Sequence, residues 1–272
     1  MQLYDDNYVT LIKKSGKEIN ISLFCVNPAK NIRQYIDKCS SVIFFSATLS
    51  PVNYYVSMLG GDDNSYRVKL PSPFKKENLK TYLSAINIRY KYRKQTLPRV
   101  FKKIYNFINE QIGNYIVFCP SYEYMNQLVE EFNKCDMGNF ILELQNPNMT
   151  ENEKVEFLKK FKENRNLIVL CVMGGMFSEG IDLPGEQLIG AVIIGVGYPK
   201  VDVENEIIKE FYGKDGYDYA YIYPGINKIQ QGAGRVIRTE NDKGRVLLID
   251  DRYATEKYSS LIPREWYPIS KY

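Results

Sequence analysis

Two arginines three residues apart, Arg235 and Arg238, follow two glycines in the stretch QQGAGRVIR, residues 230–238. Guanidinium groups bind phosphate oxygens through paired hydrogen bonds, which lysine cannot form. A helix through this stretch would place Gln231 on the same face as both arginines. A solvated polar face is the alternative interpretation. The glycines at 232 and 234 favour a ligand or a second backbone close by, because each costs about 1 kcal/mol against alanine inside a helix.

A second candidate segment is MGGMFSEGIDLPG, residues 173–185, which follows an apolar run. Its glycines free the backbone for contact with a ligand, and Ser178, Glu179 and Asp182 bring polar groups. By itself such a loop is as consistent with a simple turn as with a binding site.

The composition excludes several kinds of chemistry. The chain has no histidine, which removes Ser-His-Asp and Cys-His nucleophile systems and the HExxH metalloproteases. Its five cysteines are scattered without a CxxC pair, so we expect reduced thiols and no metal site. The P-loop pattern GxxxxGK[ST] and an acidic box for magnesium are both absent from the sequence. The net charge of +4 permits a nucleic-acid partner without proving one.

From about residue 98 onward, helical and strand patterns alternate. Helices are expected at 98–113, 121–132 and 151–161, the last with a Thr150–Glu153 capping box and with Val155, Leu158 and Phe161 facing inward. Short apolar runs predict buried strands at NYIVFC, FILELQ, LIVLCV, AVIIGV and RVLLID. This alternation predicts a doubly wound, mainly parallel α/β sheet, in which the loops after the strands' carboxyl ends build the ligand site.

The first 97 residues have a different pattern. YVTLIKKSGKEINISLFCV predicts a hairpin turning at residues 15–17, NIRQYIDKC a short helix, and SVIFFSATLSP a buried strand. We place a domain boundary near Gly60–Gly61, giving segments 1–60 and 61–272. No apolar run reaches the 18 or so residues that a membrane span needs, and the N-terminus lacks a signal-peptide layout. We therefore expect a cytoplasmic protein with no membrane partner.

Together these pieces resemble the C-terminal half of XPD/DinG-type superfamily 2 DNA helicases. SVIFFSATLSP looks like motif III of that family, VFCPSYEYM like motif IV, FSEGIDLPG like motif V and QQGAGRVIR like motif VI. SPFKKENL, NIRYKYR, KGRVLLIDDRY and LIPREW occur in the family's order. The resemblance implies a RecA-like fold of the P-loop NTPase type without its P-loop.

The resemblance also implies roles for particular residues. Gln231, Arg235 and Arg238 match catalytic motif VI residues that face ATP bound on the first RecA-like domain, with the arginines as fingers. In motif V, Glu179, Gly180 and Asp182 match cofactor-binding positions. The positions matching contacts to single-stranded DNA are Ser121, Tyr122, Gln145, Ser178 and Arg93. Tyr90 and Tyr92, beside Arg93, offer stacking faces for bases, although alternating tyrosines more often pack in a core.

The leading hypothesis is thus the second motor domain of an ATP-dependent DNA helicase, an ATP hydrolase. Its cofactors would be ATP and Mg, held mainly by a missing N-terminal helicase domain, which would also carry any iron–sulfur cluster. We expect a monomer, inactive in isolation and nucleoid-associated if bacterial, and DNA repair is one expected setting. The alternative is a non-catalytic single-stranded nucleic-acid-binding or partner-docking module. A nuclease has little support, because no acidic cluster follows the strands.

Overall fold

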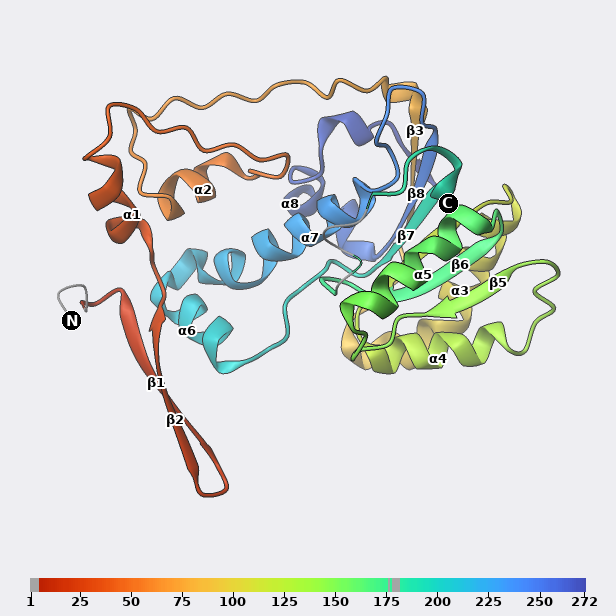
Figure 1. Cartoon of the computed structure of the whole chain (residues 1–272), viewed down its shortest axis with the longest axis horizontal. Coiled ribbons are helices and arrows are strands. Elements are labelled where there is room, and N and C mark those ends of the chain that lie inside the picture. Colours follow the sequence, from red (N-terminus) through yellow and green to blue (C-terminus); the bar gives the residue numbers. More distant parts are fainter. Residues whose placement is uncertain (1–4, 176, 178–181) are drawn as a thin grey trace. The chain divides into compact units, whose positions relative to one another are not determined.

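A computed structural model describes residues 5–175, 177 and 182–272 (Figure 1). The chain divides into two compact units, Met1–Leu70 with Pro199–Pro224, and Pro71–Tyr198 with Gly225–Tyr272. The N-terminal unit thus extends to Leu70 rather than to residue 60, and it includes a segment from the second half of the chain. Aromatic packing explains that inclusion, because the ring of Tyr54 lies 4.9 Å from that of Tyr219.

The first unit contains a β-hairpin and short helices. The strands β1 (Tyr8–Ser15) and β2 (Glu18–Cys25) pair antiparallel around Gly16, whose φ is 59°, as the sequence predicted. The helices are α1 (Ala29–Ile36), α2 (Val52–Met58), α6 (Val203–Phe211) and a π-helical stretch over Asp218–Ile222.

The predicted strand at residues 42–45 is wrong. These residues form no regular structure, and Ile43 and Phe45 are 82% and 90% exposed. An apolar run becomes a strand only when neighbouring strands supply hydrogen bonds and cover its side chains. In the described part of the chain, this run has no such neighbours.

The second unit is built on a seven-stranded sheet in the order β5-β6-β4-β7-β8-β3-β9, and every neighbouring pair is parallel. The strands are β3 (Leu79–Ser84), β4 (Tyr115–Cys119), β5 (Ile141–Leu144), β6 (Leu167–Val172), β7 (Gly190–Ile194), β8 (Gly244–Ile249) and β9 (Ile269–Lys271). The helices are α3 (Arg93–Asn109), α4 (Tyr122–Phe132), α5 (Glu151–Glu163), α7 (Tyr223–Ala233) and α8 (Glu256–Ser259). The predicted doubly wound parallel α/β fold is confirmed.

Helices cover both faces of this sheet (Figure 1). Val117 and Cys119 of β4 point into a core filled by α3 and α4, where the predicted stripe of Val100, Ile104, Phe107 and Ile108 is fully buried. Phe118 points to the opposite face, because side chains alternate along a strand. There it meets α7, since a Cβ on Gly232 would lie 3.1 Å from the Phe118 ring.

Asn114, immediately before β4, ties several elements together. Its side chain is fully buried, and its Nδ2 lies 2.9–3.0 Å from the carbonyl oxygens of Phe161, Asn164 and Gln187. Its Oδ1 accepts a hydrogen bond from Leu167 N at 2.9 Å. One side chain thereby fixes the end of α5 and the start of β6.

Helix α5 begins with the predicted capping box. Thr150 accepts from Glu153 N, and the Glu153 carboxylate accepts from Thr150 N at 2.7 Å. The predicted set of inward-facing residues on this helix was only partly right. Phe161 is buried, but Val155 is 53% exposed and Phe157 takes the second buried position, because residues four apart share a helix face.

Candidate functional site

Helix α7 runs along the sheet from the carboxyl ends of the strands toward their amino ends. At its start, a Cβ on Gly225 would lie 2.5 Å from Val196 O, just beyond the carboxyl end of β7. Past its end, Val236 packs against Gly244, the first residue of β8. The arginine segment 235–238 therefore lies toward the amino edge of the sheet, away from the carboxyl edge where parallel sheets usually bind ligands.

The helix ends earlier than the sequence predicted. It stops at Ala233, so the expected placement of Gln231, Arg235 and Arg238 on one helix face is wrong for both arginines. Their segment continues as a tighter turn, in which Arg235 N and Val236 N donate to carbonyls three residues back at 3.3 and 3.1 Å. Both arginine side chains are half-buried, so they do not form a fully solvated face either.

The two glycines of this stretch have separate explanations. Gly232 lets α7 approach the Phe118 ring of its own sheet, so its close neighbour is a side chain of the same unit and not the ligand or second backbone that the sequence suggested. Gly234 lies beyond the helix end, and it is exposed. Glycine's low helix propensity favours termination at this point.

A buried carboxylate, Asp242, holds the arginine segment in place. It is 5% exposed and accepts hydrogen bonds from Arg238 N at 2.7 Å, from Thr239 N at 2.8 Å and from the Thr239 hydroxyl. It also accepts from Gly185 N at 3.1 Å, which joins the segments of motifs V and VI. Burial raises the pKa of Asp242, but these hydrogen bonds outweigh burial and hold the pKa below its usual range.

Sequence reasoning missed Asp242. The only available signal was the turn composition of TENDKG before a strand, which suggests an aspartate that accepts from nearby backbone N–H groups. Nothing in the sequence indicated the contact with Gly185, which lies 57 residues away.

The motif V residues are partly described. Glu179, Gly180 and Ser178 lie outside the described residues. Asp182 is described, and its side chain is 78% exposed. Its Oδ1 lies 3.5 Å from Nε of Arg238, so the structure brings together one predicted residue from each of the two motifs.

Three other predicted residues lie at the carboxyl edge of the sheet. Ser121 caps α4 by accepting from Tyr124 N at 3.2 Å, and Tyr122 follows it half-buried. Gln145 follows β5 and is 4% exposed, with its Oε1 accepting from Val172 N at 2.9 Å. These side chains follow β4 and β5, two parallel strands that lie on either side of β6, at the edge where the sequence analysis expected the ligand site.

Arg93 begins α3 and lies among aromatic rings. Its Nε donates to Ile88 O at 3.1 Å, and its guanidinium carbon lies 5.8 Å from the Tyr90 ring centroid and 5.9 Å from that of Tyr124. Tyr90 is 77% exposed, so core packing does not account for it. Burial lowers the pKa of Arg93, and the nearby positive charge of Arg252 lowers it further.

Arg252 is a second arginine that sequence reasoning did not single out. The buried Asp250, at the carboxyl end of β8, holds it through two hydrogen bonds, from Nε at 2.8 Å and Nη2 at 2.7 Å. Its guanidinium carbon lies 4.9 Å from the Tyr198 ring centroid. Arg252 is thus paired with a carboxylate two residues away at this edge of the sheet.

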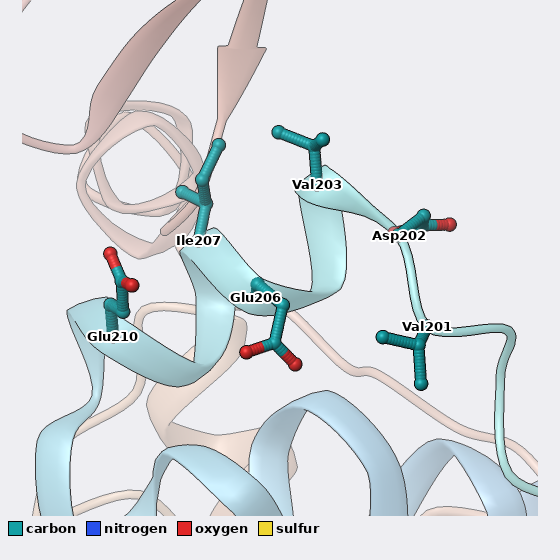
Figure 2. Close-up of a pocket in the computed structure, with 6 residues that line it drawn as sticks. All are labelled: Val201, Asp202, Val203, Glu206, Ile207 and Glu210. Atoms are coloured by element: carbon teal, nitrogen blue, oxygen red, sulfur yellow. The ribbon is translucent and has the colours of Figure 1, made fainter.

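A pocket on the first unit contains none of the predicted site residues. Figure 2 shows its lining, which comes from α6 and the residues just before it. The lining residues are Val201, Asp202, Val203, Glu206, Ile207 and Glu210. Three carboxylates repel phosphate, so this pocket does not suit a nucleotide or a nucleic-acid backbone.

In the described part of the chain, no three His, Cys, Asp or Glu side chains are grouped so that they would hold a metal ion. No helix in the same ranges is long and apolar enough to cross a membrane.

Residues 104–269 match the family described as the helicase C-terminal domain. This match covers more than half of the chain, and the chain belongs to that family. The expected resemblance to XPD-type helicases is confirmed by the relatives and the structural neighbours.

The relatives are longer proteins. A probable ATP-dependent helicase of Methanocaldococcus jannaschii is 26% identical over 272 residues, which cover 93% of this chain and 40% of that protein. The ATP-dependent DNA helicase CHL1 of Vanderwaltozyma polyspora is 23% identical, over 89% of this chain and 33% of that protein. A regulator of telomere elongation helicase 1 homolog of Culex quinquefasciatus is 24% identical, over 90% of this chain and 28% of that protein. The chain therefore spans less than half the length of these relatives.

Solved structures support the same fold. One described as an XPD helicase superposes with a TM-score of 0.73 at 19% identity and covers 98% of this chain and 48% of that chain. The Xpd4 structure of S. tokodaii has a TM-score of 0.58 at 20% identity, and the match covers 93% of this chain and 48% of that chain. These likenesses show that the two-unit chain has the fold of this part of XPD proteins.

Proposed function

We propose that this chain is the second motor domain of an ATP-dependent DNA helicase of the XPD type. It acts with a first RecA-like domain that binds ATP, and it grips single-stranded DNA. Support comes from the family match and from relatives that are named as ATP-dependent helicases. The observation that carries the proposal is the arginine segment, which a buried carboxylate fastens to the segment of motif V.

The arginines suit a phosphate that arrives from outside the chain. Arg235 and Arg238 are half-buried, where a guanidinium acts more strongly on a developing negative charge than it would in water. Asp242 fixes the backbone at Arg238, so less conformational entropy is lost when a ligand binds. ATP supplies the γ-phosphoryl group whose transfer develops that charge.

The first domain supplies the rest of the nucleotide site. The sequence contains no P-loop pattern, so the backbone cradle for the phosphates and the Mg ion belong to that partner. The arginines of this chain would complete the site across the domain cleft, and closure on ATP followed by opening after hydrolysis would drive movement along the strand.

The carboxyl edge of the sheet is the proposed track for the single strand. Ser121, Tyr122 and Gln145 offer hydroxyl and amide groups, which suit phosphate oxygens and carry no sequence information. Arg93 and the exposed ring of Tyr90 lie at the same edge, where a cation beside a stacking face suits an unpaired base.

The arginine assignment is tested in the complete helicase polypeptide that carries this segment. We expect Arg235→Ala to lower kcat for ATP by about a thousandfold or more, while nucleotide affinity changes little, because a finger acts on the transition state. Steady-state turnover and fluorescent-nucleotide titration measure the two quantities.

Arg99→Ala is the matched control, because Arg99 is an exposed arginine on α3 of the same unit. Its turnover should stay within about twofold of the unsubstituted enzyme, as is usual for a surface substitution. Unchanged turnover in Arg235→Ala would show that the finger assignment is wrong.

A further inference from the structure

The turn after β6 carries two consecutive glycines that are flanked by nitrogen donors. Gly174 has a φ of 78°, a left-handed conformation that favours glycine. The Lys228 side chain, from α7, lies across it, because a Cβ on Gly174 would come within 3.1–3.2 Å of Lys228 Cδ, Cε and Nζ. Positions 174 and 175 therefore have no side chain to cover the main chain, and the ammonium group of Lys228 lies beside them.

The ammonium of Lys228 has no counter-ion in the described part of the chain. The side chain is half-buried, and burial is the one influence on its pKa, which is lowered. A partly desolvated cation without an anion costs free energy. Its position is therefore one that an anion would stabilise.

A second donor reaches the adjacent glycine from the neighbouring strand. Gln145 is 4% exposed, and its Oε1 is already engaged by Val172 N at 2.9 Å. Its Nε2 is directed at Gly175, because a Cβ there would lie only 2.7 Å away. Any side chain at position 175 would collide with this amide, so glycine is required there.

The location favours a phosphate group as the anion. The turn stands beside the loop that contains Ser121, because Met173 N donates to Cys119 O at 3.0 Å. Ammonium and amide groups are among the donors that proteins use to hold nucleic-acid backbones. A glycine turn lets an oxyanion approach the main chain closely.

We propose that Lys228, with Gln145 across the Gly174–Gly175 turn, forms a binding site for a phosphate group of the single strand. The identity of the strand rests on the proposed function, whereas the phosphate chemistry rests on these four residues. A nucleotide is the other source of such a group, and the experiment separates the two.

The test uses the 272-residue chain and a labelled single-stranded oligodeoxynucleotide, with anisotropy measured at several salt concentrations. Lys228→Met keeps an unbranched stem over Gly174 and removes the charge. We expect affinity to fall about fivefold to tenfold and the slope of log affinity against log salt to shrink by about 0.7, the value for one lost phosphate contact on a single strand. Lys228→Arg should retain binding within about twofold, because it restores the cation.

Lys162→Met is the control, because Lys162 is an exposed lysine on α5 and its loss changes the net charge equally. If Lys228→Met and Lys162→Met behave alike in affinity and salt slope, the site is overturned. Circular dichroism of each variant ensures that both are folded.

Protection of Lys228 from acetylation, followed by mass spectrometry, identifies the source of the phosphate. We expect the oligonucleotide to protect Lys228 and not Lys162. Protection by ATP alone would overturn the assignment to the strand. If the unsubstituted chain binds no strand at all, the proposed function fails. In that case protection of Lys228 by tripolyphosphate still supports the phosphate site. If tripolyphosphate does not protect Lys228 either, the phosphate site is overturned as well.

Discussion

At the scale of single residues, Asp242 links the two segments that matter most for the proposed chemistry. A buried carboxylate is unfavourable unless several donors satisfy it. Asp242 meets that requirement with three backbone N–H groups and one hydroxyl, drawn from both sides of the site. The position of Arg238 near Asp182 therefore depends on a carboxylate that binds the main chain of this segment.

Replacing Asp242 with asparagine should destabilise the second unit. An amide offers one acceptor oxygen, and its NH₂ group would face N–H donors, so we expect the free energy of unfolding to fall by about 2–4 kcal/mol. Urea denaturation measures this loss. Asp251→Asn is the control, because Asp251 pairs with Arg89 at the surface and should cost at most about 1 kcal/mol.

The same carboxylate gives this prediction a pH dependence. Because the folded pKa of Asp242 is lowered, its stabilisation is complete above the unfolded pKa near 3.8 and is lost as the pH falls through the folded value. The difference between the unsubstituted chain and Asp242→Asn should therefore shrink below about pH 4. A difference that stays constant down to pH 2.5 would show that the carboxylate charge plays no part.

At the scale of elements, the parallel strands were the easiest features to predict from the sequence. Runs such as LIVLCV are apolar throughout because both faces of the sheet are covered, and β6 is buried from Leu167 to Cys171. The helix stripe at 100–108 was equally predictable, because its burial follows from periodicity alone.

The sequence-based predictions were wrong where contacts with other segments determine the local structure. The run at 42–45 has the composition of a buried strand but no strand beside it in the described chain. Helix α7 ends at Ala233 because glycine, a tight turn and Asp242 compete with helix continuation. The roles of Asp242 and Lys228 depend on contacts with segments more than 50 residues away, which one sequence does not reveal.

Among the elements, α5 and β6 should depend strongly on Asn114. Asn114→Ala removes the hydrogen-bond partner of the buried Leu167 N–H and of the Phe161 and Gln187 carbonyl groups. We therefore expect the free energy of unfolding to fall by about 3 kcal/mol. Asn109→Ala, which removes an exposed hydrogen bond to Tyr105 O, should cost less than about 1 kcal/mol. Thermal unfolding of both variants measures the two losses, and equal losses would contradict this role.

At the scale of the whole molecule, the two units differ in how completely they bury apolar residues. The sheet of the second unit is covered on both faces (Figure 1). In the first unit, Ile12 and Ile21 stand opposite each other on the hairpin and are 68% and 67% exposed, and Phe45 is 90% exposed. Exposed apolar surface of this kind is typical of an interaction face. This agrees with the proposal that the motor contains a further domain.

We therefore expect the isolated chain to hydrolyse no ATP. In the proposed function its arginines stabilise charge during phosphoryl transfer, but no P-loop pattern occurs in the sequence to cradle the β- and γ-phosphates or to position Mg. Phosphate release should equal that of buffer, with or without single-stranded DNA. Arg235→Ala distinguishes a contaminating ATPase from real turnover, because a contaminant is indifferent to the substitution. Strand-stimulated phosphate release that disappears in Arg235→Ala would contradict the prediction, because it would show that this chain contains a complete catalytic site.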